Sequence, residues 1–187
     1  PGIPKDHHGR ISGFAVGATP WHQDNGVLLD SADKTNMLTI WLPLTPATRE
    51  MGCLKVRPES YRSGLAHHCV RWNGLGIPEP HLPGEEEVAL PMMPGDVLFM
   101  HRLTAHGSYA NVSDQVRISY DLRYQPVGES TGREVFPGFV ARSKANPESV
   151  LTDPDVWRES WEIARHKLAT EGHGLFNRWS VDDPVCA

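Results

Sequence analysis

The chain has 187 residues, of which 39% are hydrophobic and 22% are charged, so it suits a folded domain and not a disordered chain. With 18 basic and 23 acidic residues its formal net charge is −5, and no basic run occurs, which argues against a nucleic-acid partner. No apolar stretch approaches the roughly 20 residues that span a bilayer, so we expect no membrane partner.

Short runs of β-branched, aromatic and aliphatic residues alternate with turn signals, while 17 glycines and 16 prolines interrupt the chain throughout. This pattern predicts mainly β structure with few helices. The expected strands are 11–17, 20–24, 36–44, 52–57, 87–90, 96–102, 105–110 and 116–125. One helix is expected over 154–171, because Asp153 suits an N-cap and Pro154 the first helical position. We expect one domain over 1–187, with a core at 11–127 and a C-terminal loop and helix region at 128–187.

Alternation along the expected strands separates an apolar face from a polar one. Over 36–44, Thr39 and Trp41 lie on one face and the aliphatic residues on the other. Over 116–125 the apolar set is Ile118, Tyr120 and Leu122, and the polar set is Arg117, Ser119, Asp121 and Arg123. We expect the apolar set to be packed. A barrel that holds its site inside and packs helices outside would produce this pattern.

The cysteines give no sign of a disulfide framework. Cys53, Cys69 and Cys186 are odd in number and widely spaced, which favours a reducing, cytoplasmic compartment. The first residues contain no Met and no apolar signal-peptide core, so we expect an N-terminally incomplete chain. The oligomeric state stays open.

Three residues have the types and spacing of a metal site. His22 and Asp24 are two residues apart on an extended segment and so point to the same side, and His106 can complete a set of three ligands. Two imidazoles and one carboxylate form the facial triad of non-haem Fe(II) oxygen chemistry. The turn at 111–115 is expected to place the strand of His106 beside that of Arg117, antiparallel to it. Arg117 would then supply a fixed cation for an acidic co-substrate.

Several motifs in this order resemble the phytanoyl-CoA dioxygenase family. They are 19–24, 38–44, 51–56, 94–97 and 106–108, followed by Asn111, Ser113, Arg117 and Arg123 with Tyr124. The resemblance covers roughly residues 15–127. It implies a mainly β fold with flanking helices around a double-stranded β-helix core, of the jelly-roll, cupin-like kind. It also implies Fe(II), with 2-oxoglutarate as co-substrate and O2.

The resemblance assigns roles residue by residue. His22, Asp24 and His106 resemble the iron ligands, and no catalytic residue beyond them is implied. Arg117 resembles the partner of the 2-oxoglutarate C5 carboxylate, for which a guanidinium is well suited. Ser108 resembles the hydroxyl contact to the same carboxylate. The strand that lines the co-substrate pocket carries Thr39 and Trp41.

The implied activity is an Fe(II)- and 2-oxoglutarate-dependent dioxygenase. It would hydroxylate an unactivated C–H bond of a small molecule and release succinate and CO2. Asp24 is present where halogenating relatives of this chemistry carry a small residue, so oxygen insertion is expected rather than halogenation. Arg102 and Arg123 are candidates for a substrate anion, and structural ion pairs are the alternative for both.

Two other functions stay open on sequence grounds. One is a cupin-like metal enzyme without 2-oxoglutarate, and the other is a non-catalytic small-molecule binding protein. Cupins usually bring more His ligands and need no Arg at this position, so Arg117 and Ser108 weigh against the first. The intact triad weighs against the second.

Overall fold

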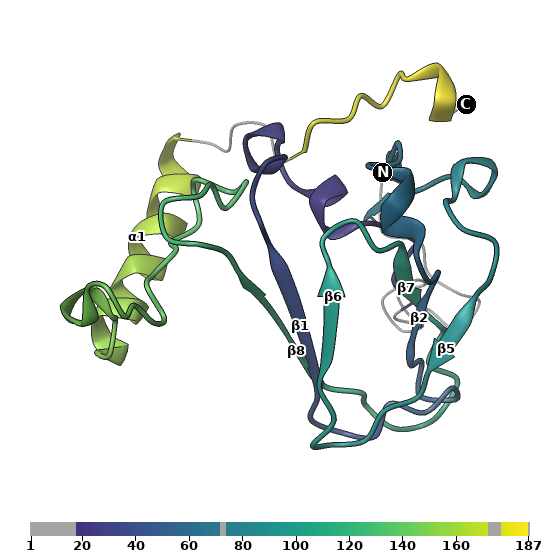
Figure 1. Cartoon of the computed structure of the whole chain (residues 1–187), viewed down its shortest axis with the longest axis horizontal. Helices are drawn as coiled ribbons and strands as arrows, with labels where there is room; N and C mark the ends of the chain where they lie inside the picture. The colour runs from purple at the N-terminus through teal and green to yellow at the C-terminus, as the bar shows by residue number, and fades with distance from the viewer. Residues whose placement is uncertain (1–17, 72–73, 172–176, 187) are drawn as a thin grey trace. The chain divides into compact units, whose positions relative to one another are not determined.

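A computed structural model describes residues 18–71, 74–171 and 177–186 (Figure 1). Its described residues fall into two compact units, each treated by itself. The first comprises 18–27, 37–71, 74–124 and 179–186, and the second comprises 28–36, 125–171 and 177–178. The single domain over 1–187 stays a prediction.

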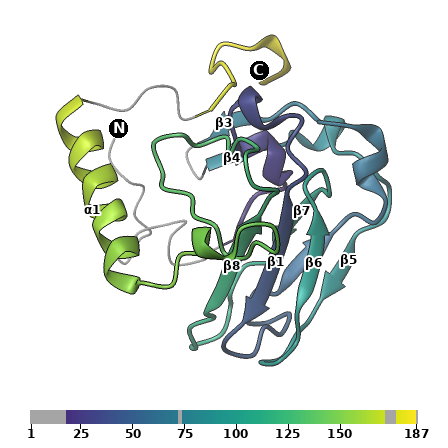
Figure 2. The same ribbon diagram turned by 60° about the vertical axis from the view of Figure 1, so that its left-hand side comes forward.

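The described part of the first unit is built from short antiparallel strands. They are β1 (Leu38–Pro43), β2 (Leu54–Val56), β3 (Cys69–Arg71), β4 (Gly74–Gly76), β5 (Val88–Leu90), β6 (Leu98–His101), β7 (His106–Ser108) and β8 (Ser119–Tyr124). One three-stranded sheet has the order β6-β1-β8, a second has the order β5-β2-β7, and β3 pairs with β4. Figure 2 shows β1 between its two neighbours. Short 3-10 turns connect them: η1 (Asp24–Val27), η3 (Ser60–Ser63), η4 (Glu79–His81) and η6 (Pro184–Cys186).

Most of the predicted strands appear, each shortened at its ends. The segment 20–24 is an exception, because it contributes only a single bridge at His22 before the chain turns into η1. The hairpin of β3 and β4 was not predicted, since Gly74–Gly76 has no β-branched or aromatic residue to indicate a strand. The predicted strand 11–17 lies outside the described residues.

The core of this unit lies between the two three-stranded sheets. Trp41 from β1 and Met100 from β6 meet Leu54 from β2 in one buried cluster. The register pairs Thr39 with Arg123 and Trp41 with Asp121, so the predicted polar face of 116–125 does turn to the same side as Thr39 and Trp41.

The opposite, apolar face of the β6-β1-β8 sheet is open. Tyr120 is 57% exposed and Phe99 is 62% exposed, and Leu122 is also exposed. The prediction that this face is packed is therefore wrong for the residues that the structure describes. The alternation fixed the direction of these side chains correctly, but alternation does not say what covers a face.

The strands of His106 and Arg117 are not side by side. β7 pairs with β2, whereas β8 pairs with β1 in the other sheet. The expected hairpin is wrong because the connection between them crosses from one sheet to the other. Asn111 bridges to Met51, and the Asn111 side-chain amide donates to the carbonyl of Gln115 at 2.8 Å. These local hydrogen bonds stabilise a connection that passes from one sheet to the other, where a hairpin turn was expected.

The second unit contains η2 (Asp30–Ala32), η5 (Pro147–Ser149) and the predicted helix, α1 (Pro154–Glu171). The predicted N-cap is confirmed, because the Asp153 carboxylate accepts the Asp155 backbone N–H at 2.8 Å. No described helix has both the length and the apolar character that crossing a membrane requires.

The expectation of no disulfide is wrong. Cys69 and Cys186 form a disulfide with their Cα atoms 5.5 Å apart, and Cys53 is free and buried. The two half-cystines are 117 residues apart in sequence, so no local spacing could signal the pair. The cytoplasmic location, which partly rested on that expectation, stays a prediction.

We expect Met100→Ala to lower the free energy of unfolding by about 2–5 kcal/mol, because Met100 is 4% exposed within the cluster between the sheets. Its neighbour Phe99 points to the open face, so Phe99→Ala is the matched control and should cost less than about 1 kcal/mol. Urea unfolding of both variants measures the difference. Equal losses would contradict a core that lies between the two sheets.

Candidate metal centre

The segment that carries His22 runs against β7 and adds to its edge. The backbone N–H groups of His22 and His106 each donate to the other's carbonyl, at 2.8 and 2.9 Å. The Ser108 N–H donates to the Thr19 carbonyl at 3.1 Å. Gly107 permits this approach, since a Cβ there would lie 2.9 Å from the Thr19 oxygen. The long-range bridge and the glycine together place the two imidazoles with their centroids 4.1 Å apart.

The three predicted ligands come together. The Nε2 atoms of His22 and His106 each lie 4.0 Å from Oδ1 of Asp24, and the three ligand atoms lie within 4.8 Å of one another. Each imidazole uses Nδ1 against a backbone carbonyl, that of Pro20 or Thr104, at 2.9 Å. A carbonyl accepts only, so Nδ1 carries the proton and the Nε2 lone pair turns toward the carboxylate.

The protonation states suit a divalent metal. Burial, followed by the nearby His106, lowers the pKa of His22 to about 3, so this imidazole is neutral at neutral pH. Burial opposes ionisation of Asp24, but His106, Arg123 and His22 outweigh it and lower the pKa of that carboxyl to about 2. Two imidazole nitrogens and one carboxylate oxygen, buried and within 4.8 Å of one another, fit non-haem Fe(II).

Asp24 is only 1% exposed and both of its oxygens have protein partners. The Thr39 hydroxyl donates to Oδ2, and Nη2 of Arg123 donates to Oδ1. Arg123 also lies 3.7 Å from Asp121. The sequence proposed Arg123 for a substrate anion and Thr39 for the co-substrate pocket. The structure places both on the metal-ligand carboxylate, and their contacts with substrate or co-substrate stay predictions.

Gln23, between the two ligands, was missed by the sequence reasoning. It is fully buried, and its amide donates to the carbonyls of Gly64 and Leu103 at 2.9 and 2.8 Å. Its Oε1 accepts the Ala66 N–H at 2.8 Å. The signal was present in the alternation: if His22 and Asp24 face the pocket, Gln23 faces the opposite side. A buried amide there has to be fully bonded.

His68 was also missed by the sequence reasoning. It is fully buried, and its Nε2 accepts the backbone N–H of Gln23 at 2.9 Å while Nδ1 faces the Ala66 carbonyl at 2.9 Å. Trp179 stacks on the ring with centroids 5.4 Å apart and donates its indole N–H to the Gly26 carbonyl at 2.6 Å. His68 and Trp179 therefore hold the backbone that presents the ligands.

The remaining predicted residues lie around this centre. Arg117 is half-buried with its guanidinium 5.6 Å above the Trp41 ring, and Ser108 accepts the Thr19 N–H at 2.8 Å. The Arg102 carbonyl accepts the Asn25 N–H at 3.1 Å, directly after the ligand Asp24. The roles assigned to these four side chains stay predictions.

A family model described as phytanoyl-CoA dioxygenase (PhyH) matches residues 10–119. The chain belongs to the phytanoyl-CoA dioxygenase family. The predicted family is confirmed.

Individual relatives agree with this membership. The chain is 34% identical over 125 residues to a 1-deoxypentalenic acid 11-beta-hydroxylase of Streptomyces arenae, covering 61% of this chain and 43% of the relative. It is 30% identical over 145 residues to the protein of the same name from Streptomyces exfoliatus, covering 72% of this chain and 50% of that relative. The chain thus spans about half the length of these relatives, or less. Since the family's relatives are named hydroxylases and dioxygenases, the predicted enzyme class is confirmed at the level of the family.

One solved structure supports the fold. The non-heme monooxygenase ThoJ, in its apo form, matches with a TM-score of 0.57 and 20% identity over 83% of this chain and 61% of that chain. The predicted mainly β fold with a jelly-roll, cupin-like core is confirmed.

We expect Gly26→Ala to destabilise the protein by about 1–3 kcal/mol, because an added Cβ would overlap the imidazole of His68. The displaced ring would also disturb the backbone between the ligands and weaken metal binding. Gly138→Ala is the control, because its Cβ would make only an ordinary contact, 3.4 Å from Thr131. Thermal unfolding and Fe(II) titration measure the two effects. Identical behaviour of both variants would contradict the close packing of His68 on Gly26.

We expect Arg123→Ala to destabilise the metal-free protein by about 2 kcal/mol, since it leaves the buried Asp24 carboxylate without its cation. The expected loss is smaller than that for a fully buried ion pair, because a third of the Arg123 side chain is exposed. A bound divalent cation should restore part of the loss. Urea unfolding of Arg123→Ala with and without Fe(II) tests this, with Arg123→Lys as the control that keeps the positive charge. A loss in the free energy of unfolding that Fe(II) leaves unchanged would contradict the charge argument.

Proposed function

We propose that this chain carries the catalytic core of an Fe(II)- and 2-oxoglutarate-dependent dioxygenase. It would hydroxylate an unactivated C–H bond of a small molecule and release succinate and CO2. The observation that carries the proposal is the buried His22, Asp24 and His106 group with both Nε2 lone pairs turned to one carboxylate. Relatives named for hydroxylation of 1-deoxypentalenic acid support hydroxylation as the reaction type.

The protein's part in this chemistry is to hold and to orient. His22, Asp24 and His106 would bind the iron, which with 2-oxoglutarate and O2 supplies the oxidising power that side chains lack. The carbonyls of Pro20 and Thr104 fix the tautomer of each imidazole, and Thr39 and Arg123 fix the carboxylate. Ligands held in this way need no reorganisation when metal binds.

Arg117 is the side chain that we assign to the C5 carboxylate of 2-oxoglutarate. It is half-buried, and burial lowers the pKa of its guanidinium, which remains a cation at neutral pH. Among the described residues no carboxylate pairs with it, and its guanidinium donates to the Ser119 hydroxyl at 3.2 Å. A half-buried cation without an anionic partner favours binding an anionic ligand. We assign the Ser108 hydroxyl as a second partner of the same carboxylate. The Trp41 ring, which lies below the Arg117 guanidinium, would form one side of the co-substrate site.

We expect anaerobic titration with Fe(II) and 2-oxoglutarate to produce the visible charge-transfer absorption of a chelate. Arg117→Ala should raise the 2-oxoglutarate concentration needed by about ten- to a hundredfold, because a hydrogen bond to a charged group contributes about 1.5–3 kcal/mol. Asp24→Ala should abolish or shift the band. Arg62→Ala is the matched control, since Arg62 is exposed and pairs with Glu59.

Absence of the band in folded wild-type protein at saturating iron would overturn the proposal. A band that Arg117→Ala leaves unchanged would instead overturn the assignment of the co-substrate cation alone. Succinate release in air, once a substrate is found, then tests the hydroxylase reaction.

A further inference from the structure

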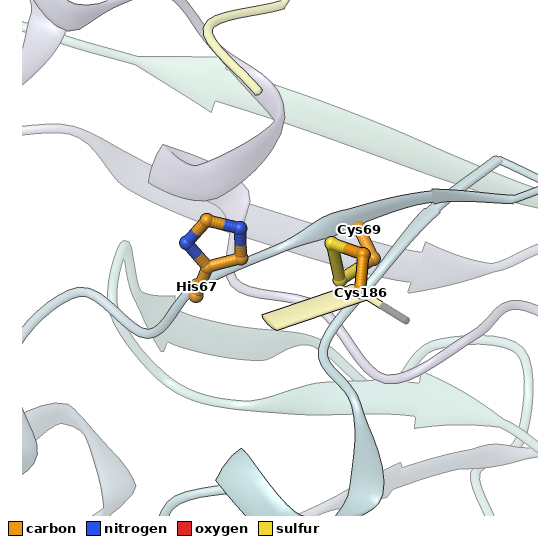
Figure 3. Close-up of side chains that lie close together, drawn as sticks. All are labelled: His67, Cys69 and Cys186. Carbon is orange, nitrogen blue, oxygen red and sulfur yellow. A yellow bond between two sulfur atoms is a disulfide. The ribbon is translucent and has the colours of Figure 1, made fainter. Parts of the chain in front are cut away.

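A second group of metal-ligand side chains lies outside the triad, where β3 meets η6. His67 precedes β3 by two residues, and the disulfide joins Cys69, the first residue of β3, to Cys186 in η6. Figure 3 shows the imidazole of His67 beside the two sulfur atoms. One ligand atom from each residue lies within 4.8 Å of the others.

The imidazole of His67 is the least satisfied part of this group. Its Nε2 is buried and has no hydrogen-bond partner among the described residues. The nearest anionic atom is Oδ2 of Asp183, at 3.3 Å without hydrogen-bond alignment. A buried imidazole nitrogen in that state is unusual and calls for an explanation, such as a missing ligand.

We propose that His67, Cys69 and Cys186 form a zinc site when the disulfide is reduced. Two thiolates and one imidazole are the soft and borderline donors that select Zn²⁺, in contrast to the sulfur-free triad. Asp183 stands close enough to His67 to fill the fourth position or to orient the ring. The disulfide and the zinc complex are then two alternative cross-links between Cys69 and Cys186.

The exchange between the two states balances. A dithiol reductant gives two electrons and two protons to the Cys69–Cys186 bond and becomes a disulfide itself. The two thiols then lose their protons as Zn²⁺ binds the thiolates. Access is available, because Cys186 borders a cavity of about 650 Å³ that is also lined by Arg71, Glu79 and His81.

The residues of this site are already held in place without the disulfide. Trp179 packs edge-on against His67 with centroids 4.6 Å apart, and its indole N–H is bonded to Gly26. The Asp183 carboxylate accepts the Val185 N–H at 3.0 Å, and its carbonyl accepts the Cys186 N–H at 2.8 Å. The C-terminal turn therefore retains anchors after reduction, which keeps Cys186 near Cys69.

The experiment uses Co²⁺ as a probe on the purified protein, reduced by a water-soluble phosphine that is oxidised to its oxide. Sulfur-to-cobalt charge-transfer absorption reports only on this site, since the triad has no sulfur. We expect the band in the reduced protein and its displacement by Zn²⁺, and no band in the oxidised protein. Cys186→Ser should abolish it, and His67→Ala should weaken Co²⁺ binding about tenfold or more.

Two matched controls isolate the site. Cys53→Ala removes the buried cysteine outside the group and should keep the band. Asp24→Ala removes a triad ligand and should also keep it. Circular dichroism of every variant confirms folding, and Zn²⁺ should raise the Tm of the reduced protein but not that of the oxidised protein.

The proposal fails if reduced, folded protein with both thiols titratable gives no sulfur-to-cobalt band. It also fails if the band survives in Cys186→Ser, or if His67→Ala binds Co²⁺ as tightly as the wild type, because the metal then lies elsewhere. If reduction unfolds the protein, Zn²⁺ must restore the fold, and its failure to do so would overturn the proposal as well.

Discussion

The candidate metal centre depends on one buried charge, the carboxylate of Asp24. A carboxylate at 1% exposure is strongly unfavourable unless its surroundings replace the lost water. Here the replacements come from the sheet opposite β7: a hydroxyl from β1 and a guanidinium from β8, while the segment that carries Asp24 is bridged to β7 at His22. The sandwich of two sheets therefore has to be assembled before Asp24 can stay ionised. The folding of the two sheets therefore also arranges the side chains of the candidate site.

A second layer of contacts fixes the backbone between the ligands. Gln23 points away from the pocket and bonds to residues 64, 66 and 103, and His68 bonds to the Gln23 N–H. Each of these groups is buried and satisfied, so displacing one leaves another unpaired. These contacts fix the backbone of His22 and Asp24, which have no strand of their own.

The sequence predicted the parts of this site that follow from local rules. The triad, the N-cap of α1 and the shared face of Thr39 and Arg123 all follow from short-range periodicity or motif. What it could not predict depends on long-range topology. The crossing between sheets after residue 108 looks like a hairpin in sequence, and the pairing of Cys69 with Cys186 has no local spacing. The burial of His68 could not be predicted, because a histidine in a short segment without clear periodicity gives no sign of burial until its partner, the Gln23 N–H, is placed.

The adjacent pair His67 and His68 connects the two metal-ligand groups. His68 bonds to the backbone N–H of Gln23, between two residues of the candidate triad, while the imidazole of His67 lies close to the sulfur atoms. Trp179 contacts both rings and also bonds to Gly26, two residues beyond Asp24. The C-terminal segment is thus packed against the backbone that presents the ligands and is closed at Cys186. Cys186 is joined to the rest of the unit by a disulfide or, in the proposal, by a metal. Either bond therefore restrains the same C-terminal segment whose contacts hold the backbone of the triad in place.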